Sequence, residues 1–141
     1  MTRYKNTLLT PIQVKVLELR SQGKTFEEIA EILGLSKTTV YTAYKAALKT
    51  IEKARNTLKL YVELRGGTYI EIPENTPVEE LLSIILKEAD VYGIKITERS
   101  SNILLKIIRQ TKCIDLEQAK TKCKIRIHID KNGVIEVEPQ A

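Results

Sequence analysis

The sequence predicts an α+β protein. It combines an N-terminal trihelical helix-turn-helix domain, whose third helix is extended, with a small two-layer α/β domain of order β-α-β-α-β-β. Before residues 65–68, Arg-Gly-Gly-Thr, all apolar periodicity is helical, and after them helical and strand patterns alternate. Residues 124–130 alternate strictly between polar residues and isoleucine. We therefore expect a helix-turn-helix domain at 1–50, a helical linker or interface at 51–65, and a C-terminal domain at 66–141.

Two capping boxes mark the first two helices. In each, a threonine that can accept a backbone hydrogen bond is followed three residues later by glutamine or glutamate. The pairs are Thr10 with Gln13 and Thr25 with Glu28. Inward-facing apolar residues are expected at helical spacing: Ile12, Val16, Leu19, Ile29, Ala30, Ile32 and Leu33. Helices this short must pack together, because none can bury its apolar stripe alone.

The third helix begins after Ser36 and continues well beyond the trihelical unit. Residues 37–64 contain no glycine or proline, and such a helix is roughly 40 Å long at 1.5 Å per residue. Four apolar residues are expected to form a seam that packs on a partner subunit or on the C-terminal domain: Leu48, Ile51, Leu58 and Val62. The alternative is a solvated linker helix held by its own charged pairs.

Residues 26–45 meet the requirements of a helix-turn-helix. Ala30 is the small residue needed where the two helices touch, and Gly34 tolerates the positive φ of the turn. Val40 and Ala43 are apolar anchors in the second helix. The pattern predicts a DNA-binding module, with a purely structural three-helix bundle as the alternative.

The charge distribution favours the same interpretation. The chain carries a net charge of +5. Residues 1–65 hold twelve Lys and Arg residues and six Asp and Glu residues, and residues 66–141 hold eleven and twelve. The net charges are therefore +6 and −1, which places the positive charge in the half expected to meet a polyanion. We expect double-stranded DNA as the partner.

The outward face of the third helix is expected to enter the major groove. Residues expected to touch bases are Lys37, Thr38, Thr39, Tyr41, Thr42 and Lys45. Residues expected to contact phosphates are Lys24, Thr25, Ser36 and Lys49, with Arg3 and Lys5 on a flexible arm. The helix start has no Arg, Asn or Gln for bidentate base contacts. One copy should discriminate weakly, so we expect a homodimer that reads half-sites about 34 Å apart.

Other classes of function find little support. No apolar run is long enough to span a membrane, and the first residues lack a secretory signal, so a cytoplasmic protein is expected. Cys113 and Cys123 are expected to be reduced core side chains, with a disulfide as the alternative. His128 is the only histidine and is expected at the surface. Because no catalytic or metal-ligand cluster is visible, we expect no enzyme, no metal and no cofactor.

Two stretches of the sequence resemble known families. Leu9-Thr10-Pro11, Glu27-Glu28-Ile29-Ala30 and Leu33-Gly34-Leu35-Ser36 resemble the fourth region of bacterial sigma factors and its response-regulator relatives. The runs at 51–58, Ile-Glu-Lys-Ala-Arg-Asn-Thr-Leu, and at 88–95 resemble the archaeal Tfx family of DNA-binding proteins. This resemblance implies an archaeal transcription factor with a family-specific C-terminal domain. Residues 37–42 depart from the helix start typical of the family, so its target sequence cannot be transferred.

The leading hypothesis is a sequence-specific, dimeric DNA-binding transcription regulator that binds the major groove through the helix starting at Ser36. The alternative is an interaction or small-molecule-sensing module. In that case the C-terminal domain binds a partner or an effector, and DNA contact is secondary.

Overall fold

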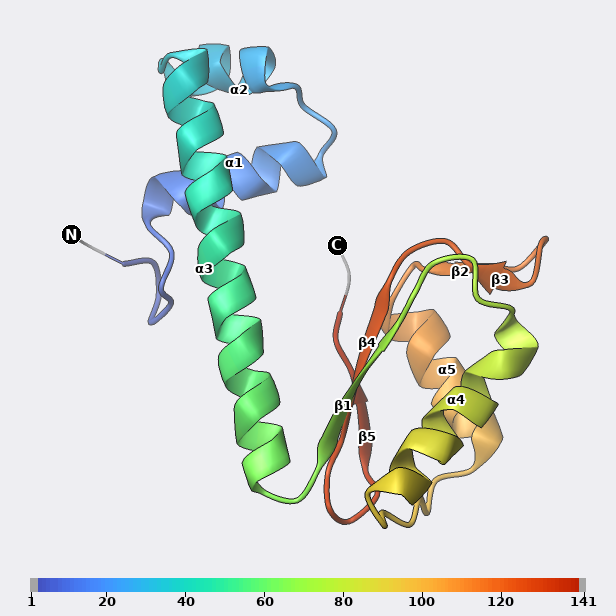
Figure 1. The fold of residues 1–141 in the computed structure, drawn as a ribbon. Helices are drawn as coiled ribbons and strands as arrows, with labels where there is room; N and C mark the ends of the chain where they lie inside the picture. The colour runs from blue at the N-terminus through green and yellow to red at the C-terminus, as the bar shows by residue number, and fades with distance from the viewer. Residues whose placement is uncertain (1–2, 140–141) are drawn as a thin grey trace. The chain divides into compact units, whose positions relative to one another are not determined.

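The computed structural model describes residues 3–139 and confirms a mixed α+β fold (Figure 1). The chain divides into two compact units, residues 1–57 and residues 58–141. The first unit is helical, and the second combines two helices with small antiparallel sheets.

The first unit contains α1 (Pro11–Ser21), α2 (Phe26–Leu33) and most of α3 (Lys37–Leu64), whose last residues belong to the second unit. Both expected capping boxes are present. Gln13 N donates to Thr10 Oγ1 (3.2 Å) and Thr10 N to Gln13 Oε1 (3.0 Å), and Thr25 and Glu28 make the same reciprocal pair. The first two helices therefore begin where local sequence chemistry predicts.

The core of the first unit is smaller than the apolar pattern suggests. Val16, Ile29 and Val40 are completely buried at its centre. Ile12 and Ile32 were expected to face inward, but they are 49% and 56% exposed. Ile12 lies a full turn before Val16, at the start of α1. Ile32 lies roughly 100° around α2 from the face formed by its inward neighbours, at 100° per residue.

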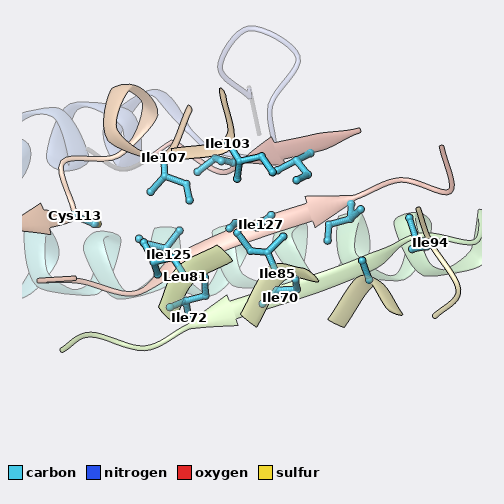
Figure 2. Packing of buried hydrophobic residues seen from close by; sticks show 14 residues of the cluster. Ile70, Ile72, Leu81, Ile85, Ile94, Ile103, Ile107, Cys113, Ile125 and Ile127 are labelled. Carbon is cyan, nitrogen blue, oxygen red and sulfur yellow. The ribbon is translucent and has the colours of Figure 1, made fainter. Parts of the chain in front are cut away.

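The second unit is built on a three-stranded antiparallel sheet of order β1-β4-β5: β1 (Thr68–Ile72), β4 (Ile125–Ile129) and β5 (Ile135–Val137). The register places Ile70 opposite Ile127, which also pairs with Val137. These side chains point to the face covered by α4 (Val78–Val91) and α5 (Ser100–Gln110), where isoleucines fill the core (Figure 2). The isoleucine alternation of residues 124–130 thus predicts both the strand and its buried face.

Two details of the second unit differ from the sequence prediction. The expected order β-α-β-α-β-β requires a strand between the two helices, but residues 94–97, which lie there, form none. Ile94 is buried, yet the segment joins no sheet. A short hairpin, β2 (Ile114–Asp115) with β3 (Lys120–Thr121), was not expected. An alternating sequence shows which side of a segment is buried, but it does not show whether a neighbouring strand is present to pair with the segment. Two-residue strands are too short to show a period-two pattern.

The start of α4 has no threonine cap, although Thr76 lies just before it. The Thr76 hydroxyl donates instead to the carbonyl of Pro73 (2.8 Å), and α4 has no side-chain cap. Thr76 N donates to Thr121 Oγ1 (2.9 Å), and Thr121 N donates back to the carbonyl of Thr76 (2.9 Å). The threonine therefore ties α4 to the hairpin.

Cys113 and Cys123 form a disulfide, so the expectation of two reduced cysteines was wrong. Their Cα atoms are 5.0 Å apart, which suits a bridge. The two residues flank the β2–β3 hairpin, and Lys122 N donates to the carbonyl of Cys113 (2.7 Å). An antiparallel hairpin returns the chain to its starting point, and this brings the two cysteines together.

Candidate nucleic-acid interface

The turn between α2 and α3 follows the chemistry of a helix-turn-helix. Gly34 ends α2 in the left-handed region, at φ +67°, and Leu35 N donates to the carbonyl of Ala30 (3.0 Å). Ser36 Oγ accepts from Thr39 N (3.1 Å) and shares a 2.8 Å bond with the Thr39 hydroxyl. The start of α3 is thus fixed by its own first turn.

The six residues expected to touch bases lie together on the outer side of α3. All are exposed: Lys37, Thr38, Thr39, Tyr41, Thr42 and Lys45. Opposite them, Val40 and Ala47 are fully buried and hold the helix in the unit. The Thr39 hydroxyl is hydrogen-bonded to the Ser36 hydroxyl, so the methyl group of Thr39 is the part that this residue presents on the exposed face.

Two of these residues are positioned by α2. Lys37 Nζ lies 2.6 Å from Glu27 Oε1, and this contact lowers the pKa of the Glu27 carboxyl. The Tyr41 ring meets the edge of Phe26, with centroids 5.3 Å apart, and Lys45 Nζ lies 5.7 Å from the Tyr41 ring. The exposed face of α3 therefore begins with an ion pair and an ordered aromatic ring.

The residues expected to contact phosphates are more dispersed. Thr25 and Ser36 use their hydroxyl oxygens as helix caps, while Lys49 is exposed on α3 and Lys24 is half-buried. Arg3 and Lys5 do not lie on an open arm. Tyr4 N donates to the carbonyl of Leu9 (2.7 Å) and Arg3 Nη1 to that of Leu8 (3.3 Å), so this segment folds back on itself.

The chain matches two family models in succession. Residues 7–51 match region 4 of sigma-70, and residues 54–137, more than half of the chain, match the model described as the C-terminal part of the DNA-binding protein TFX. The chain belongs to the Tfx family of DNA-binding proteins. This confirms the resemblance found in the sequence.

Three of the Tfx-family relatives match nearly the whole chain. A protein described as a transcriptional regulatory protein in Methanocaldococcus jannaschii is 38% identical over 94% of this chain and 96% of its own length. One of the same description in Pyrococcus abyssi is 33% identical over 93% and 88%. The DNA-binding protein Tfx of Methanothermobacter thermautotrophicus is 28% identical over 95% and 96%. The family is one of archaeal DNA-binding regulators and not of enzymes, as the sequence predicts.

The Tfx-family chain carries its expected seam on both sides of the boundary between the units. Leu48 in the first unit is 44% exposed, and Leu58 in the second is 48% exposed. Ile51 and Val62 are half-buried. The second unit also contains a pocket of about 360 Å³, which Leu58 and Val62 line together with residues of β4 and β5.

A hollow beside the outer side of α3 was missed by the sequence analysis of this Tfx-family protein. It is lined by the start of α1, including Ile12, and by Thr38 and Thr42. The spacing of Ile12 from Val16 predicts a core residue, but Ile12 is exposed and lines the hollow instead. Elsewhere, residues 3–139 contain no helix long and apolar enough to cross a membrane and no cluster of metal-ligating side chains.

Proposed function

We propose that this protein is a sequence-specific transcription regulator that inserts the start of α3 into the major groove of double-stranded DNA. The observation that carries the proposal is the single exposed face formed by the six residues from Lys37 to Lys45 named above, directly after a capped helix start. Family membership supports DNA as the partner. In this proposal residues 1–50 read DNA, residues 51–65 link or pair copies, and residues 66–141 form the regulatory domain, in the cytoplasm.

The phosphate contacts surround this face. The exposed Lys49 extends the positive charge of α3, and Lys24 precedes the N-terminus of α2. The backbone N–H groups that follow Ser36 favour an anion at the start of α3, whereas the carboxylates of Glu27 and Glu28 in the first turn of α2 oppose one beside Thr25. Arg3 and Lys5 act from the folded segment before α1 and not from an extended arm.

Footprinting on genomic fragments tests the proposal. Wild type should protect discrete sites, and Lys37→Ala and Tyr41→Ala should each lose that protection because both side chains lie on the reading face. Lys15→Ala is the matched control, since Lys15 is an exposed lysine of α1 outside this face. Protection that is independent of DNA sequence, or that is equal in wild type and all variants, would contradict the proposal.

We further propose that the protein acts as a homodimer. The exposed leucines of the seam support a second copy as the partner, because they would otherwise leave apolar surface in water. Sedimentation of Leu48→Ser and Leu58→Ser should show a lower mass than wild type. Leu60→Ser is the control, because Leu60 is 55% exposed on the same helix but outside the seam. A mass equal in all four proteins contradicts the dimer seam.

A small-molecule effector is the second candidate function, and the pocket of the second unit favours it. Its volume of about 360 Å³ suits a small ligand. Its lining combines apolar residues with ionisable ones: Leu58, Val62, Val134 and Val137 with His128, Asp130, Glu136 and Glu138. A ligand that binds only the folded state raises the melting temperature. A compound library should therefore include members that stabilise wild type but not Val62→Phe, which fills the pocket. Equal stabilisation of both proteins by every active compound argues against this site.

A further inference from the structure

The hollow beside the reading face is formed by two helices of the first unit. It has a volume of about 750 Å³ and lies between the start of α1 and the outer side of α3. Its lining residues are Thr10, Pro11, Ile12, Gln13, Thr38, Thr39, Thr42, Ala43 and Ala46. Three of the nine, the threonines of α3, belong also to the proposed base-reading face. The hollow is therefore continuous with the surface that meets DNA.

The lining differs in chemistry from the other side of α3. None of its nine side chains carries a charge, and most present methyl or methylene groups. On the side towards α2, by contrast, Lys37 pairs with Glu27 and Lys45 Nζ lies 5.7 Å from the Tyr41 ring. Ile12 is half-exposed here although the core closes without it. An uncharged, methyl-lined hollow does not attract a phosphate, but burial of an apolar group in it lowers the free energy of the complex.

One polar group is held at this hollow. Gln13 Oε1 accepts from Thr10 N (3.0 Å) as part of the capping box, so the side-chain amide is fixed by the start of α1. The other end of the same amide, Nε2, is a donor. The hollow thus combines apolar walls with a hydrogen-bond donor whose position is set in advance.

Among the groups that base pairs expose in the major groove, the C5-methyl of thymine is the apolar one, and the acceptor O4 of thymine lies next to it. We infer that this hollow recognises thymine: Ile12, Thr42 and Ala46 cover the methyl group, and Gln13 Nε2 donates to O4. Ile12 and Gln13 are then specificity-determining residues outside the helix-turn-helix itself. The inference rests on the proposed function, because α3 must lie in the major groove.

Uracil substitution isolates the methyl group. Duplexes are first selected by the wild-type protein from a randomised library, and each thymine of a selected site is then replaced in turn by deoxyuridine. Only the C5-methyl is removed, so pairing is kept. Fluorescence anisotropy should show about fourfold weaker binding at a thymine whose methyl group is buried. At thymines outside the contact, the dissociation constant should stay unchanged.

The variant Ile12→Ala assigns the effect to the hollow. It should bind the thymine and deoxyuridine duplexes with nearly equal affinity at that position. Ile32→Ala is the matched control, because Ile32 is also exposed but lies on α2 away from the hollow. It should keep the wild-type preference. Thr42→Ser, which removes one methyl group and keeps the hydroxyl, should reduce the preference and needs no repacking of the core.

The outcomes separate this inference from the proposed function. Selection of discrete sequences together with indifference to every deoxyuridine overturns the thymine site and leaves the regulator proposal standing. The same holds if Ile12→Ala keeps the full preference. A change in sedimentation of Ile12→Ala with unchanged DNA binding assigns the hollow to a protein partner and overturns it as well. Failure to select any discrete sequence removes both proposals.

Discussion

Lys37 is the residue at which the proposed DNA contact competes with an ion pair inside the protein. Its ammonium group is paired with Glu27 at 2.6 Å on an exposed surface, and the pair keeps Glu27 ionised through a lowered pKa. In the proposed complex, a DNA site must therefore draw Lys37 away from a carboxylate that also repels phosphates. Exposed ion pairs contribute little to stability, so the main effect of Glu27 falls on DNA affinity.

We predict that Glu27→Gln binds its DNA about threefold to tenfold more tightly at low salt, because one repulsive charge is lost and Lys37 is released. Anisotropy titrations across a salt series measure the change. Glu31→Gln removes the same charge from an exposed position of α2 without a pairing to Lys37. A gain of the same size in Glu31→Gln would show that net charge alone accounts for the effect.

His128 gives the second unit a pH dependence. It lies on β4 opposite Tyr69 and Glu136, and burial lowers its pKa although Glu138 and Glu136 act in the other direction. Because the folded pKa lies below the unfolded value, the unfolded chain binds the proton more readily. Stability is complete above the unfolded pKa and is lost as the pH falls below about 6.5.

Urea unfolding at pH 8 and pH 5.5 tests this assignment. Wild type should lose stability at the lower pH, and His128→Gln should lose less, because the titrating group is gone. Carboxylate effects remain in both proteins and cancel in the difference. Identical losses would show that His128 is not the group responsible.

At the scale of elements, the turn between β4 and β5 contains a glycine that leaves no room for a side chain. Gly133 has φ +84°, and a Cβ atom there would overlap the backbone carbonyl of Lys95. The extended segment at 94–97 thus packs directly on the hairpin turn. This contact explains why the segment is ordered and buries Ile94 without joining a sheet.

Gly133→Ala should destabilise the second unit by more than about 2 kcal/mol, since the substitution adds a backbone clash to the cost of a left-handed residue. Gly93→Ala is the control: Gly93 has φ +68° but open space around its Cβ position. It should cost about 1 kcal/mol from conformation alone. If chemical denaturation shows the same loss of unfolding free energy in both variants, the clash with Lys95 does not contribute to the effect of Gly133→Ala.

The elements also show which features a sequence can predict. Capping boxes, Gly34 and the strict alternation of β4 act locally, so their positions follow from neighbouring residues. Ile12 and residues 94–97 obey the same local patterns, but their roles depend on what lies across from them in space. The outer face of α3 was predicted because it is the reverse of its buried face. The hollow could not be predicted in this way, because it forms only where the start of α1 packs beside α3 in space.

For the whole molecule, the disulfide is a covalent brace of the second unit. It closes a loop of sequence separation 10 around the β2–β3 hairpin, and Cys113 is fully buried in the core. A loop of this size stabilises a fold by about 2–3 kcal/mol. The hydrogen bonds of Thr121 to Pro73 and Thr76 hold the hairpin independently, so loss of the bridge should weaken the unit without unfolding it.

Reduction of the wild-type protein should therefore lower the melting temperature by about 10 °C. The double variant Cys113→Ala and Cys123→Ala should melt at the same temperature with and without reductant. A thiol titration of the unfolded chain before reduction checks that the bridge was present. If reductant shifts the double variant as well, the effect does not come from this bond.

The pairing of β1 with β4 has a consequence for the order in which the protein is made. Thr68 of β1 lies opposite Ile129 of β4, so the central strand β4 is synthesised long after its neighbour β1. The buried residues of the first unit extend only to Ala47, and all of them leave the ribosome earlier. Domains generally fold in that order during synthesis. A nascent chain interrupted before β4 thus already carries the complete surface proposed to face the bases, while the second unit still lacks the central strand of its sheet.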